Sequence, residues 1–314
     1  MRYRPLGKNG PPISVVGFGT WAGGGGMWGP TDDDEIIAAM QRAHDLGVTW
    51  YDTADAYGWG HAEELVADAF DGRRDEVFIA TKLGITPRGV VLTPEHIRKA
   101  CDASLLRLRT DRIDLYQVHW PADRKTPLEE SWDAMAALQD QGKVRFLGVS
   151  NFKVKHLERC EPIRHIDSLQ PHYSMLVREP EKELIPWCRE HGTGMVSYGS
   201  LAYGILTGKF TSDATFPSDD WRSGEMGIDY YEHLFAPKAF GKHLRTVDEL
   251  REIADGLDLT VAQLAVAWLL RDDAVTSAIC GAKRPSQIEE TAAAGDVELD
   301  PSTVDVIEKV LSGR

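Results

Sequence analysis

Four polar side chains capable of acid–base chemistry lie at or just beyond the ends of short apolar runs. Asp52, Lys82 and His119 each follow a run of apolar and β-branched residues, and Tyr57 lies in a turn shortly after Asp52. A phenol can donate a proton, and a neighbouring ammonium stabilises the phenolate and lowers the phenol pKa. A carboxylate can hold that ammonium, and an imidazole can donate a hydrogen bond to a carbonyl oxygen. The set predicts protonation of an oxygen, with hydride transfer from a nicotinamide as the companion step at carbon.

Two other interpretations of these residues compete with this one. Each residue could be an ordinary polar residue at the rim of a sheet, since loops beside strand ends are commonly polar. Four of them at successive strand ends are harder to explain in that way. A metal site built on Asp52 and His119 is disfavoured, because no second His or Cys stands nearby at ligand spacing. We therefore expect an enzyme without a metal.

The elements that hold these residues alternate between strand and helix. Apolar runs indicate eight strands, at 15–18, 48–51, 77–81, 113–118, 145–149, 167–169, 194–197 and 276–280. Helical periodicity lies between them, at 32–46, 62–70, 94–108, 128–141, 153–160, 181–191 and 261–270. Thr31 and Thr93 precede acidic residues and are expected to cap two of these helices. This alternation predicts an α/β fold, a (β/α)8 TIM barrel, with an open doubly wound sheet as the alternative.

Three segments add to a minimal barrel. The stretch 3–14, with Asn-Gly at 9–10, predicts a β-hairpin that plugs the face opposite the active site. A long loop at 210–242, after the seventh strand, is typical of a functional lid, and 301–311 indicates an extra C-terminal helix. No segment resembles a linker, so 1–314 is expected to be a single domain.

Composition narrows the class of protein. The chain has 35 basic and 49 acidic residues, a formal net charge of −14, which argues against nucleic acid or an acidic membrane as a partner. The four cysteines show no CxxC spacing and are expected to be structural thiols. The sequence shows neither a signal peptide nor an apolar run long enough to span a bilayer, so a cytoplasmic location is expected.

One motif invites a different interpretation. Residues 17–22 match the G-x-G-x-x-[GA] fingerprint of dinucleotide-binding open sheets. That fingerprint requires a helix to begin within it, so that helix amides face a pyrophosphate. Four glycines follow at 23–26, which do not favour a helix there. We expect a glycine-rich loop beside the pocket instead.

Several motifs in order along the chain together resemble the aldo-keto reductase family, including bacterial general-stress and channel-β-like members. The stretches are DTADAYG at 52–58, ATK at 80–82, DLYQVHW at 114–120, GVSNF at 148–152 and LTGK at 206–209. The resemblance implies a (β/α)8 barrel in which Tyr57 is the proton donor and Asp52 and Lys82 tune it. It also implies that His119 orients the carbonyl and that Trp120 lines the substrate pocket.

The same resemblance implies contacts along a nicotinamide cofactor. Ser150, Asn151 and Gln170 are expected at the carboxamide, where short amides and hydroxyls suit its edge, and Tyr198 on the ring. The full set is Gly19, Thr20, Trp21, Asp52, Ser150, Asn151, Gln170, Tyr198, Gly199, Ser200, Leu201, Gly204, Leu206, Lys209, Gly281, Lys283, Gln287 and Glu290. Ser200, Ala62 and Thr291 depart from the common family pattern, and Thr291 does so at a position expected to contact the adenine.

The cofactor is expected to be NADP(H) rather than NAD(H), although NAD(H) is possible. Lys283 and Arg284 immediately precede a helix expected at 285–294. Two cations at a helix N-terminus suit a phosphate monoester, and they oppose the negative charge of the whole chain. The alternative is a solvated basic turn.

The substrate pocket is expected to be aromatic, with Trp21, Trp28, Trp59 and Trp120 in loops at the active face. Aromatic walls suit apolar carbonyls and also stack on sugar rings, although several of these residues could simply pack the loops together. The first functional hypothesis is an NADP(H)-dependent reductase of aldehydes and ketones, and the second is a sugar or polyol dehydrogenase. A third, of another class, is a nucleotide-sensing regulatory subunit similar to potassium-channel β subunits. The physiological substrate, the reaction direction and the oligomeric state stay open.

Overall fold

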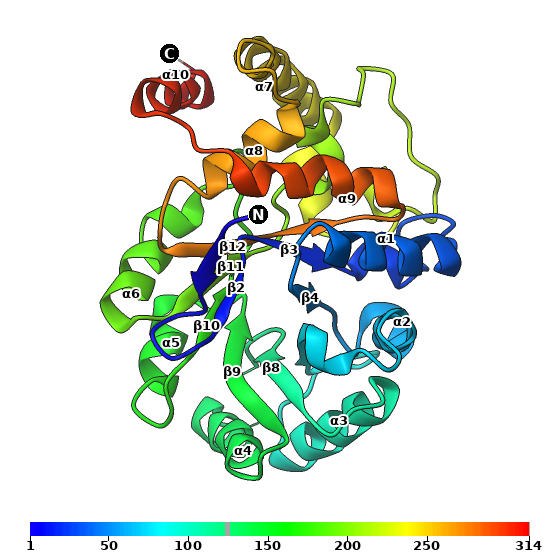
Figure 1. The fold of residues 1–314 in the computed structure, drawn as a ribbon, viewed down its shortest axis with the longest axis vertical. Helices are drawn as coiled ribbons and strands as arrows, with labels where there is room; N and C mark the ends of the chain where they lie inside the picture. Colours follow the sequence, from blue (N-terminus) through cyan, green and yellow to red (C-terminus); the bar gives the residue numbers. More distant parts are fainter. Residues whose placement is uncertain (123–125, 314) are drawn as a thin grey trace.

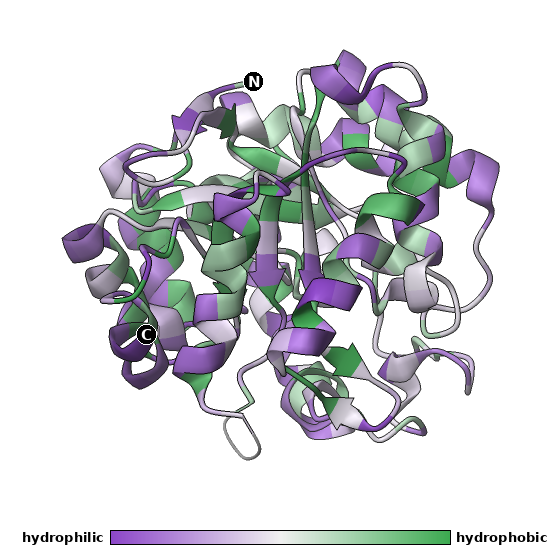
Figure 2. Ribbon diagram, turned by 90° about the horizontal axis from the view of Figure 1, so that it is seen from below, coloured by the Kyte–Doolittle hydropathy of each residue, from purple (hydrophilic) through white to green (hydrophobic). Residues whose placement is uncertain are grey.

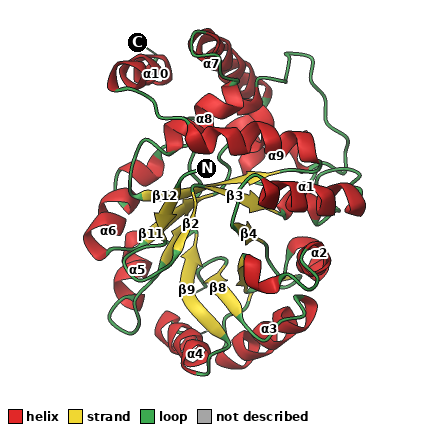
Figure 3. Ribbon diagram, viewed as in Figure 1, coloured by secondary structure: helices red, strands yellow, loops and turns green. Residues whose placement is uncertain are grey.

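The chain folds into a closed barrel of eight parallel strands surrounded by helices (Figures 1 and 3). The structure, a computed structural model, describes residues 1–122 and 126–313. The barrel strands, in their order around the barrel, are β3 (Val16–Gly19), β4 (Trp50–Asp52), β5 (Phe78–Leu83), β8 (Ile113–Val118), β9 (Val144–Ser150), β10 (Ser168–Gln170), β11 (Gly194–Ser197) and β12 (Val275–Gly281). The barrel expectation is confirmed, and the open-sheet alternative is wrong.

Helices follow the barrel strands and pack around them (Figure 1). They are α1 (Asp33–Asp45), α2 (His61–Ala69), α3 (Pro94–Arg107), α4 (Leu128–Asp140), α5 (Val154–Cys160), α6 (Leu184–His191), α7 (Pro237–Asp255), α8 (Val261–Leu269), α9 (Pro285–Ala292) and α10 (Pro301–Ser312). Thr93 caps α3 as expected, by accepting from His96 N. The cap of α1 is Asp32 rather than Thr31, because the Asp32 carboxylate accepts from the amides of Asp34 and Glu35.

Two apolar layers hold the barrel together. Side chains such as Trp50, Phe78 and Leu115 fill its interior, and a larger cluster lies between the strands and the helices. Figure 2 shows hydrophobic residues gathered toward the centre and hydrophilic residues on the outer helices. Gly17, the first glycine of the fingerprint, is a packing residue, since a Cβ there would lie 2.2 Å from the Trp50 ring. No α-helix begins until Asp33, so the fingerprint match is accidental, as expected.

The N-terminal hairpin closes one end of the barrel. Its strands are β1 (Tyr3–Pro5) and β2 (Pro12–Ser14), paired antiparallel. Leu6 and Ile13 are buried in the interior cluster. The hairpin therefore plugs the barrel as predicted. A second small hairpin, β6 (Ile85–Thr86) with β7 (Gly89–Val90), follows β5 at the opposite end.

The loop after β11 is shorter than expected. It was predicted to run to 242, but α7 begins at Pro237, a residue that is well suited to the first turn of a helix. Within the loop, Trp221 is fully buried and its amide donates to Met27 O over 3.1 Å. The loop is thereby fastened to the glycine-rich loop that follows β3.

The described residues show neither a helix that is long and apolar enough to cross a bilayer nor a cluster of His, Cys, Asp and Glu that could hold a metal ion. The four cysteines are buried free thiols, and burial raises the pKa of each to about 12. They are therefore protonated at neutral pH.

Candidate active site

The barrel register brings the predicted acid–base residues to one mouth. Asp52 ends β4, Lys82 is the penultimate residue of β5, and His119 directly follows β8. Asp52 pairs in register with Ala80 of β5, and Lys82 pairs with Gln117 of β8. Because parallel strands end at the same face of a barrel, these side chains converge there.

Lys82 lies at the centre of this group and is fully buried. Its ammonium donates to Asp52 Oδ1 over 2.5 Å, to the Thr53 carbonyl over 2.9 Å and to Tyr57 Oη over 3.2 Å. These three contacts use all three donors of the ammonium. Burial acts to lower the pKa of Lys82, but Asp52 and Tyr57 outweigh it and the pKa is raised. The ammonium is therefore charged at neutral pH.

Asp52 is held on its other side by two amides. Gln170 Nε2 donates to Asp52 Oδ2 over 2.8 Å, and Gln117 Nε2 does so over 3.4 Å. Gln170 ends β10, across the barrel from β4. The carboxylate is thus fixed by three elements and cannot turn away from Lys82.

Tyr57 begins a 3-10 turn, Tyr57–Gly60, after β4. Gly58 is left-handed (φ 59°), and a Cβ there would lie 2.1 Å from the Gly24 carbonyl oxygen. The glycine-rich loop thus lies directly against this turn. Burial raises the pKa of Tyr57 and Lys82 lowers it, with burial the larger effect. The net direction is opposite to the lowering expected from the sequence, so the phenol is protonated at neutral pH.

His119 lies beside the phenol. The two rings meet edge to face, with centroids 5.7 Å apart. Burial, with a smaller contribution from Lys82, lowers the pKa of His119 well below its usual value. Its Nδ1 is buried without a hydrogen-bond partner among the described residues. The imidazole is neutral and carries a single ring N–H.

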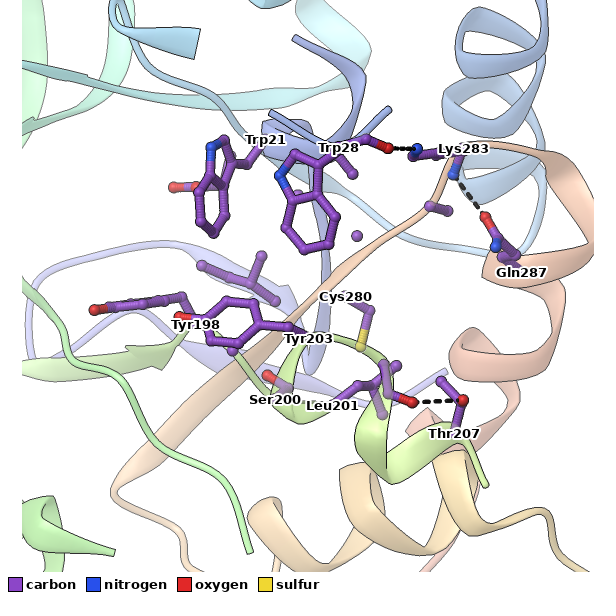
Figure 4. A pocket seen from close by; sticks show the side chains of 18 of the residues that line it. Trp21, Trp28, Tyr198, Ser200, Leu201, Tyr203, Thr207, Cys280, Lys283 and Gln287 are labelled. Atoms are coloured by element: carbon purple, nitrogen blue, oxygen red, sulfur yellow. Dashed lines mark hydrogen bonds between the residues drawn. The ribbon is translucent and has the colours of Figure 1, made fainter. Parts of the chain in front are cut away.

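Two adjoining cavities share Trp21, Tyr57 and Tyr198 as a common wall. The first, of about 330 Å³, extends from Asp52 to Lys283 and Gln287. The second, of about 270 Å³, contains His119. Figure 4 shows Trp21 and Trp28 on one wall of the first cavity, opposite Tyr198 and Tyr203, with Lys283 and Gln287 at its far end.

Most of the residues expected at the cofactor line these cavities. The first holds Gly19, Trp21, Asp52, Tyr198, Gly199, Ser200, Leu201, Gly204, Gly281, Lys283 and Gln287, and the second holds Ser150, Asn151 and Gln170 as well as the shared wall. The four expected substrate-pocket tryptophans also line them, Trp21 in both, Trp28 in the first, and Trp59 and Trp120 in the second.

Four expected cofactor residues do not line either cavity. Thr20 is buried and donates to the Asp52 carbonyl, and Leu206 lies in the apolar core. Lys209 and Glu290 form an ion pair at 2.7 Å between the segment after β11 and α9. In this structure these four residues lie outside the linings of both cavities, and their contacts with a cofactor stay a prediction.

The residues expected at the nicotinamide carboxamide are held by hydrogen bonds to one another and to their neighbours. Asn151 is left-handed (φ 63°), a conformation that Asn tolerates better than most residues. Its Nδ2 donates to the His119 carbonyl and to Ser150 Oγ, and its Oδ1 accepts from Tyr198 Oη over 2.7 Å. Tyr198 Oη lies 2.6 Å from Tyr230 Oη. Tyr230, from the loop after β11, thereby joins this network.

Sequence reasoning missed several residues of the first cavity, among them Tyr203 and Arg222. Tyr203 is left-handed (φ 56°) and packs edge to face on Trp221, with centroids 4.8 Å apart. Arg222 pairs with Asp220 at 2.6 Å and lies over the rings of Trp28 and Phe216. No local motif marked either residue, because each reaches the cavity only through the packing of the long loop.

Lys283 and Arg284, the basic pair before α9, lie in different surroundings. Lys283 lines the first cavity, and its ammonium donates to the Trp28 carbonyl over 2.5 Å. Burial, and then Arg222, lower the pKa of Lys283. Arg284 occupies the N-cap position of α9 and is exposed, and its side chain donates to Ser286 over 3.4 Å.

Comparison with known proteins identifies one family. The model of the aldo/keto reductase family matches residues 15–312. The aldo-keto reductase YhdN of Bacillus subtilis is 38% identical over 297 residues, covering 92% of this chain and 87% of that protein. The solved structure of the glycerol dehydrogenase AKR11B4 from Gluconobacter oxydans is 35% identical, with a TM-score of 0.88, covering 99% of this chain and 95% of that one.

Other relatives carry names that differ in function or cofactor. A probable voltage-gated potassium channel subunit beta of Arabidopsis thaliana is 35% identical, covering 100% of this chain and 98% of that protein. At 34% and 31% identity, a Schizosaccharomyces pombe relative is named for NADP(+) and an Escherichia coli relative is named an NADH-specific methylglyoxal reductase. The pombe and coli alignments cover 93% and 95% of this chain, and 86% and 95% of those proteins.

Proposed function

Because the chain belongs to the aldo/keto reductase family, whose members are oxidoreductases of carbonyls and alcohols, we propose that it reduces aldehydes and ketones to alcohols with NADP(H) and Tyr57 as the proton donor. One observation carries the proposal. The buried ammonium of Lys82 joins the Asp52 carboxylate to the Tyr57 phenol at the wall that both cavities share. One cavity can then hold the cofactor while the other holds the carbonyl compound.

Tyr57 is suited to give a proton rather than to take one. Its raised pKa keeps the phenol protonated until a carbonyl oxygen beside it gains negative charge. A reduced nicotinamide, when bound, supplies the hydride that adds to the carbonyl carbon. The phenol proton then passes to the oxygen, giving an alcohol, and the phenolate that is left lies 3.2 Å from the Lys82 ammonium. Lys82 therefore stabilises the charge that develops in the step.

His119 orients the carbonyl in this proposal. Its lowered pKa keeps the ring neutral, so it does not compete with Tyr57 as an acid. A neutral imidazole still offers one N–H, and the ring lies edge to face with Tyr57. Two donors, one from the turn after β4 and one from the residue after β8, thus converge where a carbonyl oxygen can lie.

The first cavity fits a dinucleotide. Gly19, Gly199, Gly204 and Gly281 line it, so backbone can approach a ligand closely along its length. Its far end carries the Lys283 ammonium beside the N-terminus of α9, where amides and a cation both favour a phosphate. This arrangement supports NADP(H) as the preferred cofactor, although relatives are named for both nicotinamide cofactors.

Absorbance of the reduced cofactor, measured with a panel of aldehydes, ketones and sugars, tests the proposal. NADPH should be oxidised in the presence of a carbonyl compound, and Tyr57→Phe should abolish most of that oxidation. The absence of cofactor oxidation with every member of the panel would refute a reductase.

A second candidate function is the reverse reaction. It is favoured by the glycerol dehydrogenase from Gluconobacter oxydans, which aligns over nearly the whole chain. Oxidation of glycerol or a sugar with NADP+ that is more efficient than any carbonyl reduction would favour it.

The Arabidopsis relative supports a third candidate, a regulatory subunit that binds the nucleotide, for which tight NADPH binding without turnover is the expected result.

A further inference from the structure

The second cavity is uncharged along its described wall. Its lining includes Met27, Ile85, Trp59, Trp120 and Tyr230, and none of the lining residues in the described parts of the chain is Asp, Glu, Lys or Arg. The one titratable imidazole there, His119, is neutral. A charged substrate would lose its hydrating water on entering this cavity, and it would find no counter-ion among the described lining residues.

The polar side chains in this cavity are already bound to one another. Ser150 Oγ donates to the Gln170 carbonyl, and the Gln170 amide donates to Asp52. Both polar atoms of the Asn151 amide are in hydrogen bonds with neighbouring residues. A substrate with several hydroxyls would therefore find few free partners beyond the acid–base residues, and buried hydroxyls without partners disfavour binding.

Trp59 has an unusual backbone conformation at the cavity mouth. It is left-handed (φ 55°), between Gly58 (φ 59°) and Gly60 (φ 105°). A bulky residue pays a conformational cost there, so the surrounding structure must impose it. The backbone on both sides of Trp59 is closely packed: a Cβ on Gly58 would meet the Gly24 carbonyl at 2.1 Å, and one on Gly60 would meet Arg107 at 2.4 Å.

This constrained turn holds an aromatic face open. Trp59 is 63% exposed and Trp120 is 39% exposed, and neither contacts another aromatic ring of the described chain. By contrast, Trp21 packs against Trp28 and Trp221 in an interlocked cluster. An open indole at the mouth of an apolar cavity is suited to stack on a flat ring.

Resting on the proposed function, we propose that the substrate is an uncharged carbonyl compound with a flat apolar body, and that Trp59 determines this specificity. The carbonyl reaches Tyr57 and His119 at the inner end of the cavity, and the ring lies at the mouth against Trp59. Charged carbonyls and short polyols are poor substrates.

The test compares three aldehydes with NADPH: benzaldehyde, para-carboxybenzaldehyde and glyceraldehyde. The variants are Trp59→Ala, Trp59→Phe and the control Leu106→Ala, whose side chain is 79% exposed on α3 and lines neither cavity. Benzaldehyde should have the highest kcat/KM. In Trp59→Ala the ratio of kcat/KM for benzaldehyde to that for glyceraldehyde should fall about tenfold, the size expected from loss of one aromatic contact. Trp59→Phe should restore most of that ratio, and Leu106→Ala should not change it.

Equal or better kcat/KM with para-carboxybenzaldehyde or glyceraldehyde would overturn the inference, as would an unchanged ratio in Trp59→Ala. Calorimetric binding of benzamide, an uncharged aromatic compound that is not reduced, separates this inference from the proposed function. Benzamide binding that weakens in Trp59→Ala, without turnover of any aldehyde, would support the pocket and refute the reductase. Absence of benzamide binding in an enzyme that reduces glyceraldehyde would support the reductase and refute the apolar pocket.

Discussion

The Lys82 ammonium lies 3.2 Å from the Tyr57 phenol oxygen and has no solvent-exposed surface. A buried cation needs compensation, and the Asp52 carboxylate supplies it at 2.5 Å. Of Asp52, Lys82 and Tyr57, only Tyr57 lines both cavities. The Lys82–Tyr57 contact therefore connects a fixed interior charge to the place where a substrate oxygen can lie.

Replacing Tyr57 by Phe removes the proposed proton donor and leaves the ring in place. We expect turnover to fall by about 10²–10⁴-fold, the usual range for a lost general acid. The dissociation constant for NADPH should stay close to that of the parent, because the hydroxyl contacts Lys82 rather than the residues at the far end of the first cavity. Single-turnover kinetics and a fluorescence titration measure the two quantities. Turnover equal to that of the parent would remove Tyr57 from the mechanism.

Replacing Lys82 by Met leaves the Asp52 carboxylate buried without its cation. Breaking a buried pair by removing one partner typically costs about 3–5 kcal/mol of stability. Adding Asp52→Asn should recover part of the free energy of unfolding, because the uncompensated charge is gone, whereas turnover should stay low in the double variant. Urea denaturation of the parent, both single variants and the double variant measures this. If the second substitution lowered stability further, the buried-charge explanation would fail.

Much of the barrel could be predicted because its signals are local. The runs at 113–118 and 194–197 coincide with β8 and β11, since short β-branched runs between helices leave little freedom in assignment. Asp52, Lys82 and His119 then had to meet, because strand ends in a barrel share one face. The pattern of apolar runs therefore predicted that Asp52, Lys82 and His119 lie at one face of the barrel.

The remainder depends on contacts between distant segments. Arg222 and Tyr203 reach the first cavity because Trp221 is buried beneath them, which no local pattern indicates. The pKa of Tyr57 is raised because burial outweighs Lys82, and the extent of burial is a property of the folded chain. Arg284, adjacent to Lys283 in sequence, is exposed and does not line the cavity that Lys283 lines.

Asp55 should make stability depend on pH. Burial, and then Glu63, raise its pKa to about 7, against the opposing effect of Arg107, and its Oδ1 has no hydrogen-bond partner among the described residues. The folded state then holds this proton more tightly than the unfolded state. The resulting stabilisation is complete below the unfolded pKa near 4 and is lost as the pH rises through about 7.

Asp55→Asn should therefore be more stable than the parent at pH 8, by on the order of 4 kcal/mol, and equal to it near pH 4. Asp71→Asn, at an exposed position, is the matched control and should show no such difference. Urea unfolding at both pH values gives the result. A difference that is the same at pH 4 and pH 8 would show that packing, rather than ionisation, is responsible.

The two cations before α9 should contribute unequally to cofactor choice. Lys283 lines the first cavity at its far end, whereas Arg284 is exposed and contacts Ser286. A charged hydrogen bond to a phosphate is worth about 1.5–3 kcal/mol, so Lys283→Ala should raise the NADPH dissociation constant by about 10–100-fold. The dissociation constant for NADH, which lacks the 2′-phosphate, should rise far less. Arg284→Ala is the matched control and should shift the NADPH value by a smaller factor. Equal losses for both cofactors in Lys283→Ala would instead indicate a general electrostatic effect, and the proposed NADP(H) preference would lose its structural support.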